Sequence, residues 1–100
     1  MTIKLIKRPL NGAEIRLDGR VDTNTAPAVE NALLKIASEY QNLELNLSDL
    51  VYVSSAGLRT LQVLQKQVLR SGGSLALSHA NSAVMEIFEM AGFGEVAGVR

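Results

Sequence analysis

Two adjacent serines, Ser54 and Ser55, carry the hydroxyl groups of this chain that are best placed to do chemistry. They lie between an apolar strand expected over residues 43–47 and an amphipathic helix expected over residues 56–70. A hydroxyl at the start of a helix can cap the free amides of the first turn. The same amides, with the positive end of the helix dipole, also favour a phosphate. The sequence therefore leaves two roles open for Ser55: a helix cap, or a phosphate acceptor that switches the protein.

No other group of residues predicts catalysis. His79 is the one histidine, and the residues two positions before the two serines are Tyr52 and Val53, so the G-x-S-x-G motif of hydrolases is absent. Gly72 and Gly73 lack the lysine that a phosphate-binding loop needs, and we interpret them as a helix stop. We expect no catalytic residues, no cofactor and no metal site, and we predict that the chain is not an enzyme.

Composition narrows the class of protein. With 100 residues, of which 47% are hydrophobic, the chain is expected to form one globular domain over residues 1–100. Basic and acidic residues number 10 each, so no cationic surface for nucleic acid is predicted. We find no apolar run of membrane-spanning length and no signal peptide at the start, and cysteine is absent. We therefore expect a cytoplasmic protein without direct membrane insertion.

Strand-like and helix-like patterns alternate along the chain, which predicts an α/β fold. Asn11-Gly12 indicates a hairpin turn, and Asp18-Gly19 is expected to end the second strand. The expected sheet is mixed and mostly parallel, with an antiparallel N-terminal hairpin and about three helices. The predicted elements are strands near 3–7 and 13–17, a helix capped from within 22–25, a strand at 43–47, a helix at 56–70, a strand at 74–78, a helix capped by Asn81 that ends at Gly92 and Phe93, and a short strand within 96–99.

Short motifs along nearly the whole chain resemble those of the STAS family, the domain named for sulfate transporters and anti-sigma factor antagonists. Any one of them is weak, but together, at these spacings, they are specific for the fold. The motifs are Gly19-Arg20-Val21-Asp22, the strand and turn at 45–50, Tyr52-Val53-Ser54-Ser55-Ala56-Gly57-Leu58, Gly72-Gly73, Ser82-Ala83-Val84 and the segment 88–93.

The resemblance implies a phosphorylation switch. In free-standing bacterial members, the serine that aligns with Ser55 is phosphorylated by an anti-sigma factor that is also a serine kinase. The unphosphorylated antagonist binds that partner and frees a sigma factor, and a metal-dependent serine phosphatase resets the cycle. Such a chain is expected to be a monomer when free. The partner surface implied by the resemblance comprises Asp22, Asn24, Ser54, Ser55, Ala56, Gly57 and Arg59.

Three points remain open on the sequence alone. STAS domains also serve as subunits of lipid or anion transporters, in which phosphorylation is not required, so this function is the alternative. Asp22 is either a turn or capping residue or part of the partner surface. Gly57 either admits a kinase loop to the hydroxyl or lets the helix pack closely on a strand. The family often has Asp where this chain has Ser54, and Ser or Thr where it has Ala56.

Overall fold

The computed structural model describes residues 1–90 and contains the predicted alternation of strands and helices. One short strand, β4, was not predicted from the sequence. The helix end at Gly92-Phe93 and the last strand within 96–99 lie outside the described residues. In chain order the elements are β1 (Thr2–Arg8), β2 (Gly12–Val21), α1 (Ala26–Glu39), β3 (Asn42–Asn46), β4 (Leu50–Val53), α2 (Ser55–Arg70), β5 (Ser74–Ser78) and α3 (Ser82–Met90).

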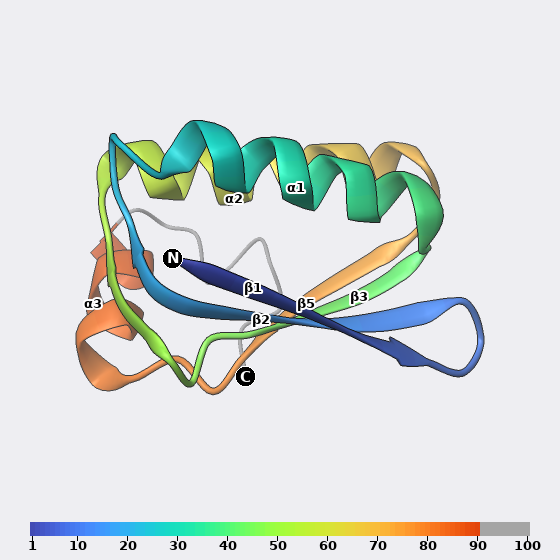
Figure 1. Cartoon of the computed structure of the whole chain (residues 1–100), viewed down its shortest axis with the longest axis horizontal. Coiled ribbons are helices and arrows are strands. Elements are labelled where there is room, and N and C mark those ends of the chain that lie inside the picture. The colour runs from blue at the N-terminus through green and yellow to red at the C-terminus, as the bar shows by residue number, and fades with distance from the viewer. Residues whose placement is uncertain (91–100) are drawn as a thin grey trace.

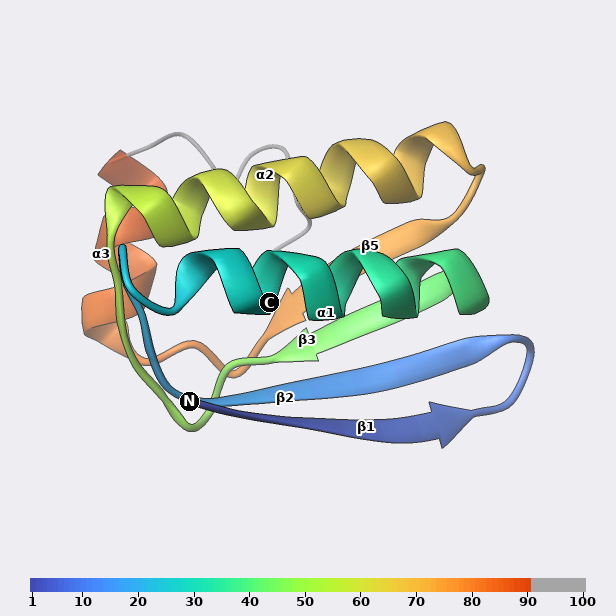
Figure 2. The same ribbon diagram turned by 45° about the horizontal axis from the view of Figure 1, so that its top comes forward.

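The sheet is organised around β2. β1 pairs with β2 antiparallel, whereas β3 and β4 both pair with β2 in parallel, and β5 pairs in parallel with β3. α1 and α2 run side by side across one face of this sheet, and α3 lies at the end of the sheet where α1 and α2 begin (Figures 1 and 2). The mixed, mostly parallel sheet with an antiparallel hairpin is confirmed.

The hairpin between β1 and β2 turns one residue earlier than the sequence predicts. Leu10 and Asn11 have φ values of 61° and 56°, and Gly12 already pairs with Arg8 as the first residue of β2. Asn tolerates this left-handed conformation well, whereas Leu adopts it rarely. The hairpin itself is confirmed, but the turn is centred on Leu10-Asn11.

β2 does not end at Asp18-Gly19, so that prediction is wrong. Gly19 has a φ of +114°, a conformation that glycine adopts without strain, and the strand continues to Val21. This extension forms because β4 pairs with the last residues of β2. Gly19 pairs with Leu50 and Arg20 pairs with Tyr52, so Val51 is an extra residue in a β-bulge.

The bulge also explains why β4 escaped sequence analysis. Leu50 and Val53 are buried, while Val51 and Tyr52 are 63% and 38% exposed. In a regular strand, residues three apart point to opposite faces. The extra residue brings Leu50 and Val53 to the same face, so the strand lacks the alternation of period two on which prediction depends.

The core lies between the sheet and the two long helices. On α2, Leu61 and Leu64 are fully buried, which confirms the predicted phase of that helix. Within residues 1–90, no helix is long and apolar enough to cross a membrane. The buried apolar cluster also includes Ala13, Ile15, Leu17 and Val21 of β2, Val29 and Leu33 of α1, Leu43 and Leu45 of β3, Val68 of α2 and Phe88 of α3.

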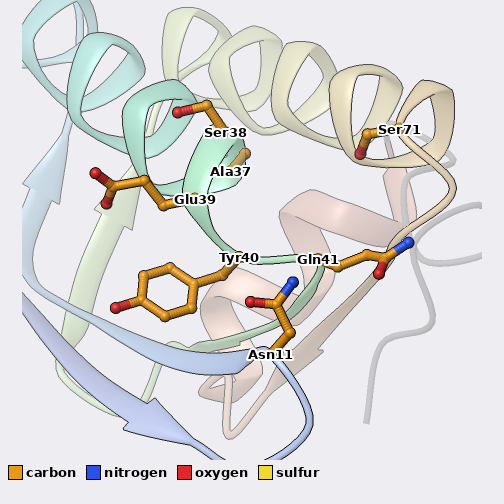
Figure 3. A pocket seen from close by; sticks show the side chains of 7 residues that line it. All are labelled: Asn11, Ala37, Ser38, Glu39, Tyr40, Gln41 and Ser71. Carbon is orange, nitrogen blue, oxygen red and sulfur yellow. The ribbon is translucent and has the colours of Figure 1, made fainter.

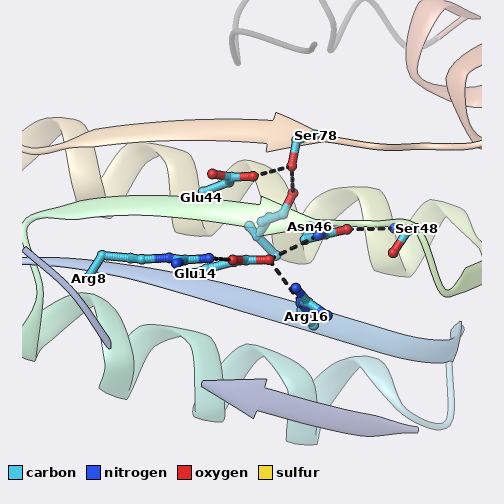
Figure 4. A network of polar contacts seen from close by, with 8 residues as sticks. Arg8, Glu14, Arg16, Glu44, Asn46, Ser48 and Ser78 are labelled. Carbon is cyan, nitrogen blue, oxygen red and sulfur yellow. Dashed lines mark hydrogen bonds and ion pairs between the residues drawn. The ribbon is translucent and has the colours of Figure 1, made fainter. Parts of the chain in front are cut away.

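A polar cluster occupies alternate positions on β2 and β3. Glu14, only 3% exposed, accepts hydrogen bonds from Arg8, from Arg16 Nε at 2.9 Å and from Asn46 Nδ2 at 2.9 Å (Figure 4). These hydrogen bonds, that from Asn46 foremost, lower the pKa of Glu14 from 4.5 to about 2. Glu14 therefore remains a carboxylate and joins the hairpin to the centre of the sheet.

Candidate functional site

The candidate site lies where β2 and β4 end and α1 and α2 begin. Val21 and Val53 are the last paired residues of the two strands. The Ser54 amide donates a hydrogen bond to the Val21 carbonyl at 2.9 Å, which ties the start of α2 to the end of β2. The loop 22–25 and the two serines therefore leave the sheet side by side, at the left of Figures 1 and 2. Ligand sites in sheets with parallel strands commonly lie at such an edge.

Ser54, and not Ser55, caps α2. The backbone of Ser54 is extended, and its side chain accepts a hydrogen bond from the Gly57 amide at 3.2 Å. Ser55 is the first residue of the helix, one residue before the predicted start, and is exposed. The capping role that the sequence left open for Ser55 is therefore filled by its neighbour. Within residues 1–90, the Ser55 hydroxyl makes no hydrogen bond.

Gly57 permits close packing of α2 on the sheet. A Cβ atom at this position would lie 2.6 Å from the Val21 carbonyl oxygen and 2.6 Å from Val53 Cγ2. Real Cβ atoms essentially never approach other atoms this closely, so a larger residue would push the helix away. Of the two explanations for Gly57, the geometry favours packing, because the position is buried against the two strands.

Asp22 organises the loop that precedes α1. Its Oδ1 accepts hydrogen bonds from the amides of Asn24 at 3.0 Å and Thr25 at 3.1 Å. Those hydrogen bonds, that from Thr25 foremost, hold the pKa of Asp22 below its usual range. Thr25 is the N-cap residue of α1, within the predicted range 22–25, but its side chain makes no capping hydrogen bond to the helix. A role of Asp22 and of the exposed Asn24 in partner binding stays a prediction.

A surface hollow of about 300 Å³ joins the starts of the two helices. Ala56 and Arg59 line it from α2, within one turn of Ser55, which is not itself a lining residue. The structure thus brings the loop 22–25 together with the predicted residues of α2. From α1 and the preceding loop, the hollow is lined by Thr23, Ala26, Pro27 and Glu30, and from α2 also by Thr60.

Arg20 and Tyr52 form a contact beside the site that sequence analysis missed. The Arg20 Cζ atom lies 4.5 Å from the centroid of the Tyr52 ring, within the range of a cation–π interaction. The available signal was positional, since Arg20 stands two residues before Asp22 and Tyr52 stands two before Ser54. Only the register between β2 and β4 shows that the two side chains meet.

Another hollow, of about 170 Å³, lies where α1 and α2 end (Figure 3). The serines lie at the other end of α2, where that helix begins. This hollow is lined by Asn11, Tyr40, Gln41 and Ser71 among others, and contains none of the predicted site residues. His79 is exposed, with a φ of 62°, directly after β5. Neither feature joins the site at the serines.

Comparison with known proteins places the chain in a family. The sequence profile of the STAS domain matches residues 4–99. This chain belongs to the STAS domain family. The anti-sigma-B factor antagonist of Bacillus subtilis strain 168 is 26% identical over 94 residues, covering 94% of this STAS domain and 86% of the relative. BtrV of Bordetella bronchiseptica, named as a candidate anti-sigma factor antagonist, is 33% identical over 93 residues, covering 91% and 80%.

Solved structures confirm the STAS fold. An anti-sigma factor antagonist from Mycobacterium paratuberculosis superposes with a TM-score of 0.87 at 19% identity, covering 98% of this chain and 83% of the other. Phosphorylated SpoIIAA of Bacillus superposes with a TM-score of 0.76 at 15% identity, covering 99% and 91%. The STAS domain of a SulP transporter from Vibrio cholerae gives 0.72 at 25% identity, covering 93% and 75%. Both antagonists and transporter domains are therefore similar to this chain.

Proposed function

We propose that this STAS domain, residues 1–100, is an anti-sigma factor antagonist controlled by phosphorylation of Ser55. It binds an anti-sigma factor with serine kinase activity while Ser55 carries a free hydroxyl, and it releases that partner once Ser55 is phosphorylated. A metal-dependent serine phosphatase restores the binding form. The cycle runs in the cytoplasm, with the domain a monomer when free. The names of the two relatives support the antagonist role.

The observation that carries this proposal is that Ser54 caps α2 whereas Ser55 is exposed. Ser54 supplies the cap that α2 needs, through its contact with the Gly57 amide. Ser55 is exposed and has no hydrogen-bonding duty within the described part of the chain. Its hydroxyl can therefore be modified without removing a contact on which the fold depends.

The start of α2 suits a phosphate. The first turn of the helix holds no acidic residue, and Arg59 lies one turn beyond Ser55. A phosphoserine carries about −1.5 to −2 charges at neutral pH and is favoured at a helix N-terminus. Phosphorylation is thus expected to leave the domain folded and to act on the surface that the partner covers.

Release follows from the order of events. Binding precedes phosphoryl transfer, so the partner surface must fit the neutral hydroxyl. A negative charge at position 55 would then be buried without a partner, which costs several kcal/mol. Because about 1.4 kcal/mol is a tenfold change in affinity, even partial burial of that charge is enough for release.

The test combines mass spectrometry with a binding titration, using the anti-sigma factor kinase of the same genome. Ser55→Asp should weaken binding at least about tenfold, and Ser55→Ala should bind but accept no phosphate. Ser54→Ala is the matched control and should still be phosphorylated. Phosphate on Ser54, or undiminished phosphate in Ser55→Ala, would refute the assignment.

The second candidate function is a constitutive STAS subunit of a lipid or anion transport system. The observation that favours this second function is the similarity to the STAS domain of the SulP transporter, at 25% identity. A transporter subunit would co-purify with transporter components whatever the state of Ser55. The absence of phosphate on the wild-type protein with any neighbouring kinase, together with such co-purification, would favour this function over the antagonist.

A further inference from the structure

The stacked pair of Arg20 and Tyr52 places a guanidinium at the edge of the candidate site. The Arg20 Cζ atom is 4.5 Å from the Tyr52 ring centroid, and its Nε is 4.0 Å from Oδ2 of Asp22. The ring and the carboxylate therefore restrain the side chain from two directions. Since both neighbours, Val21 and Val53, are buried and paired, the backbone beneath the stack is also fixed.

The stack is exposed, and part of its hydrogen-bonding capacity is unused. The Arg20 side chain is 58% exposed, and Tyr52 is 38% exposed. Within residues 1–90, the Nη groups of Arg20 donate no hydrogen bond. Arginine and tyrosine are enriched among the residues that dominate binding energy at interfaces. A guanidinium held in one orientation also loses less entropy on binding than a free one.

The position of the stack makes it reachable by whatever covers Ser55. Tyr52 precedes Ser55 by three residues, so their Cα atoms are at most about 11 Å apart. A standard interface buries about 800 Å² on each partner, equivalent to a disc about 16 Å in radius. Asp22, which contacts Arg20, belongs to the loop beside the serines. A partner centred on Ser55 therefore extends over the stack.

We propose that Arg20, stacked on Tyr52, determines partner specificity by receiving a carboxylate of the anti-sigma factor. This inference rests on the proposed function, because it names the chemistry of that partner. A planar guanidinium fork matches a carboxylate with two parallel hydrogen bonds, which the ammonium of a lysine does not reproduce. Tyr52 acts as a positioning residue that keeps the fork in the orientation required.

The experiment is a calorimetric titration with the anti-sigma factor kinase of the same genome, without ATP so that no phosphate is transferred. Arg20→Ala and Arg20→Lys should each raise the Kd about tenfold, whereas Tyr52→Phe should stay within about threefold because the ring face is kept. Lys35→Ala, an exposed cation on α1, is the control and should bind like the wild type. The wild-type Kd should also depend more steeply on salt than that of Arg20→Ala.

Unfolding midpoints of all variants keep the interpretation clear. If Arg20→Ala loses stability, Arg20→Lys decides, because it keeps the charge and most of the aliphatic chain. Wild-type affinity in both Arg20 variants would overturn the inference, and so would rescue by lysine, which would show that charge alone is read. Loss of binding in Ser55→Asp but not in the Arg20 variants would reject this inference and leave the proposed function standing. Failure of the wild type to bind would reject both.

Discussion

Ser54 and Gly57 are joined by a hydrogen bond of 3.2 Å, in which the Gly57 amide donates to the Ser54 hydroxyl. This contact assigns the two adjacent serines to different tasks. Ser54 belongs to the fold, because it satisfies an amide of the first turn that has no partner within the helix. Ser55 is exposed at the surface. Substitution of the two serines should therefore change the stability of the protein by different amounts.

Removing the cap should cost stability. Ser54→Ala should lower the free energy of unfolding by about 1 kcal/mol, the usual cost of losing a serine cap. Ser55→Ala removes an exposed hydroxyl that makes no hydrogen bond to any of residues 1–90, so it should change the free energy of unfolding by less than about 0.5 kcal/mol. Urea denaturation of both variants checks this. Equal losses in the two variants would mean that the cap is shared or misassigned.

Adding one methyl group at position 57 should disrupt packing. In Gly57→Ala, the new Cβ would lie 2.6 Å from Val21 O and 2.6 Å from Val53 Cγ2, so helix and strands must separate. Overpacking of this kind costs about 1–3 kcal/mol. Gln62→Ala, an exposed change on the same helix, is the control for the thermal midpoint. Normal stability with lost partner binding would instead assign Gly57 to the interface.

The buried face of α2 can be tested with three leucines of one helix. Leu61→Ala and Leu64→Ala should each destabilise by about 2–5 kcal/mol, because both side chains are fully buried. Leu69, which is 59% exposed, provides the matched control, and Leu69→Ala should have little effect. Chemical denaturation gives the three values. A loss at Leu69 as large as at Leu61 would show that another surface covers it.

Phosphorylated protein should be as stable as the free form, or slightly more so. The added charge meets the amides and the positive dipole end of α2, whose first turn has no acidic residue. Differential scanning calorimetry of the kinase-treated and untreated protein measures the change in Tm. Ser55→Ala treated in the same way controls for modification elsewhere. A large fall in Tm would mean that release occurs by unfolding.

Acid should destabilise the protein partly through Glu14. Its pKa is about 2 in the folded protein against 4.5 ordinarily, so folding favours the carboxylate. The resulting stabilisation is fully present above about pH 4.5 and is lost as pH falls towards 2. The stability difference between wild type and Glu14→Gln, measured by urea denaturation, should therefore shrink across this window. Glu86→Gln, at an exposed position of α3, is the control. A constant difference would exclude Glu14.

Much of the architecture was predictable because local patterns and tertiary packing agree. The spacing of Leu61 and Leu64 predicted the buried face of α2, and the hairpin at Asn11 was correctly expected. Gly19 misled because a glycine between polar residues resembles a turn, whereas here it lies within a strand that a distant strand extends. Strand pairing of that kind depends on contacts far apart in the sequence, which local propensity cannot register.

The site was predictable in location but not in detail. The sequence located two hydroxyls at the start of a helix, yet could not decide between Ser54 and Ser55 as the cap, since either residue type suits the position. The stack of Arg20 on Tyr52 depends on the bulge in β4, so the contact cannot be predicted from the spacing of residues in the sequence.

The exposure of Ser55 depends on the number of residues in β4, because the bulge at Val51 adds one residue before α2 begins. Leu50 and Val53 reach the same face only because one extra residue separates their paired positions. Substitution of the exposed Val51 is easily accommodated, whereas inserting or deleting a residue between Leu50 and Val53 would change the phase in which the chain enters α2. Among homologous sequences aligned over this segment, gaps should therefore be far rarer than exchanges of side chain.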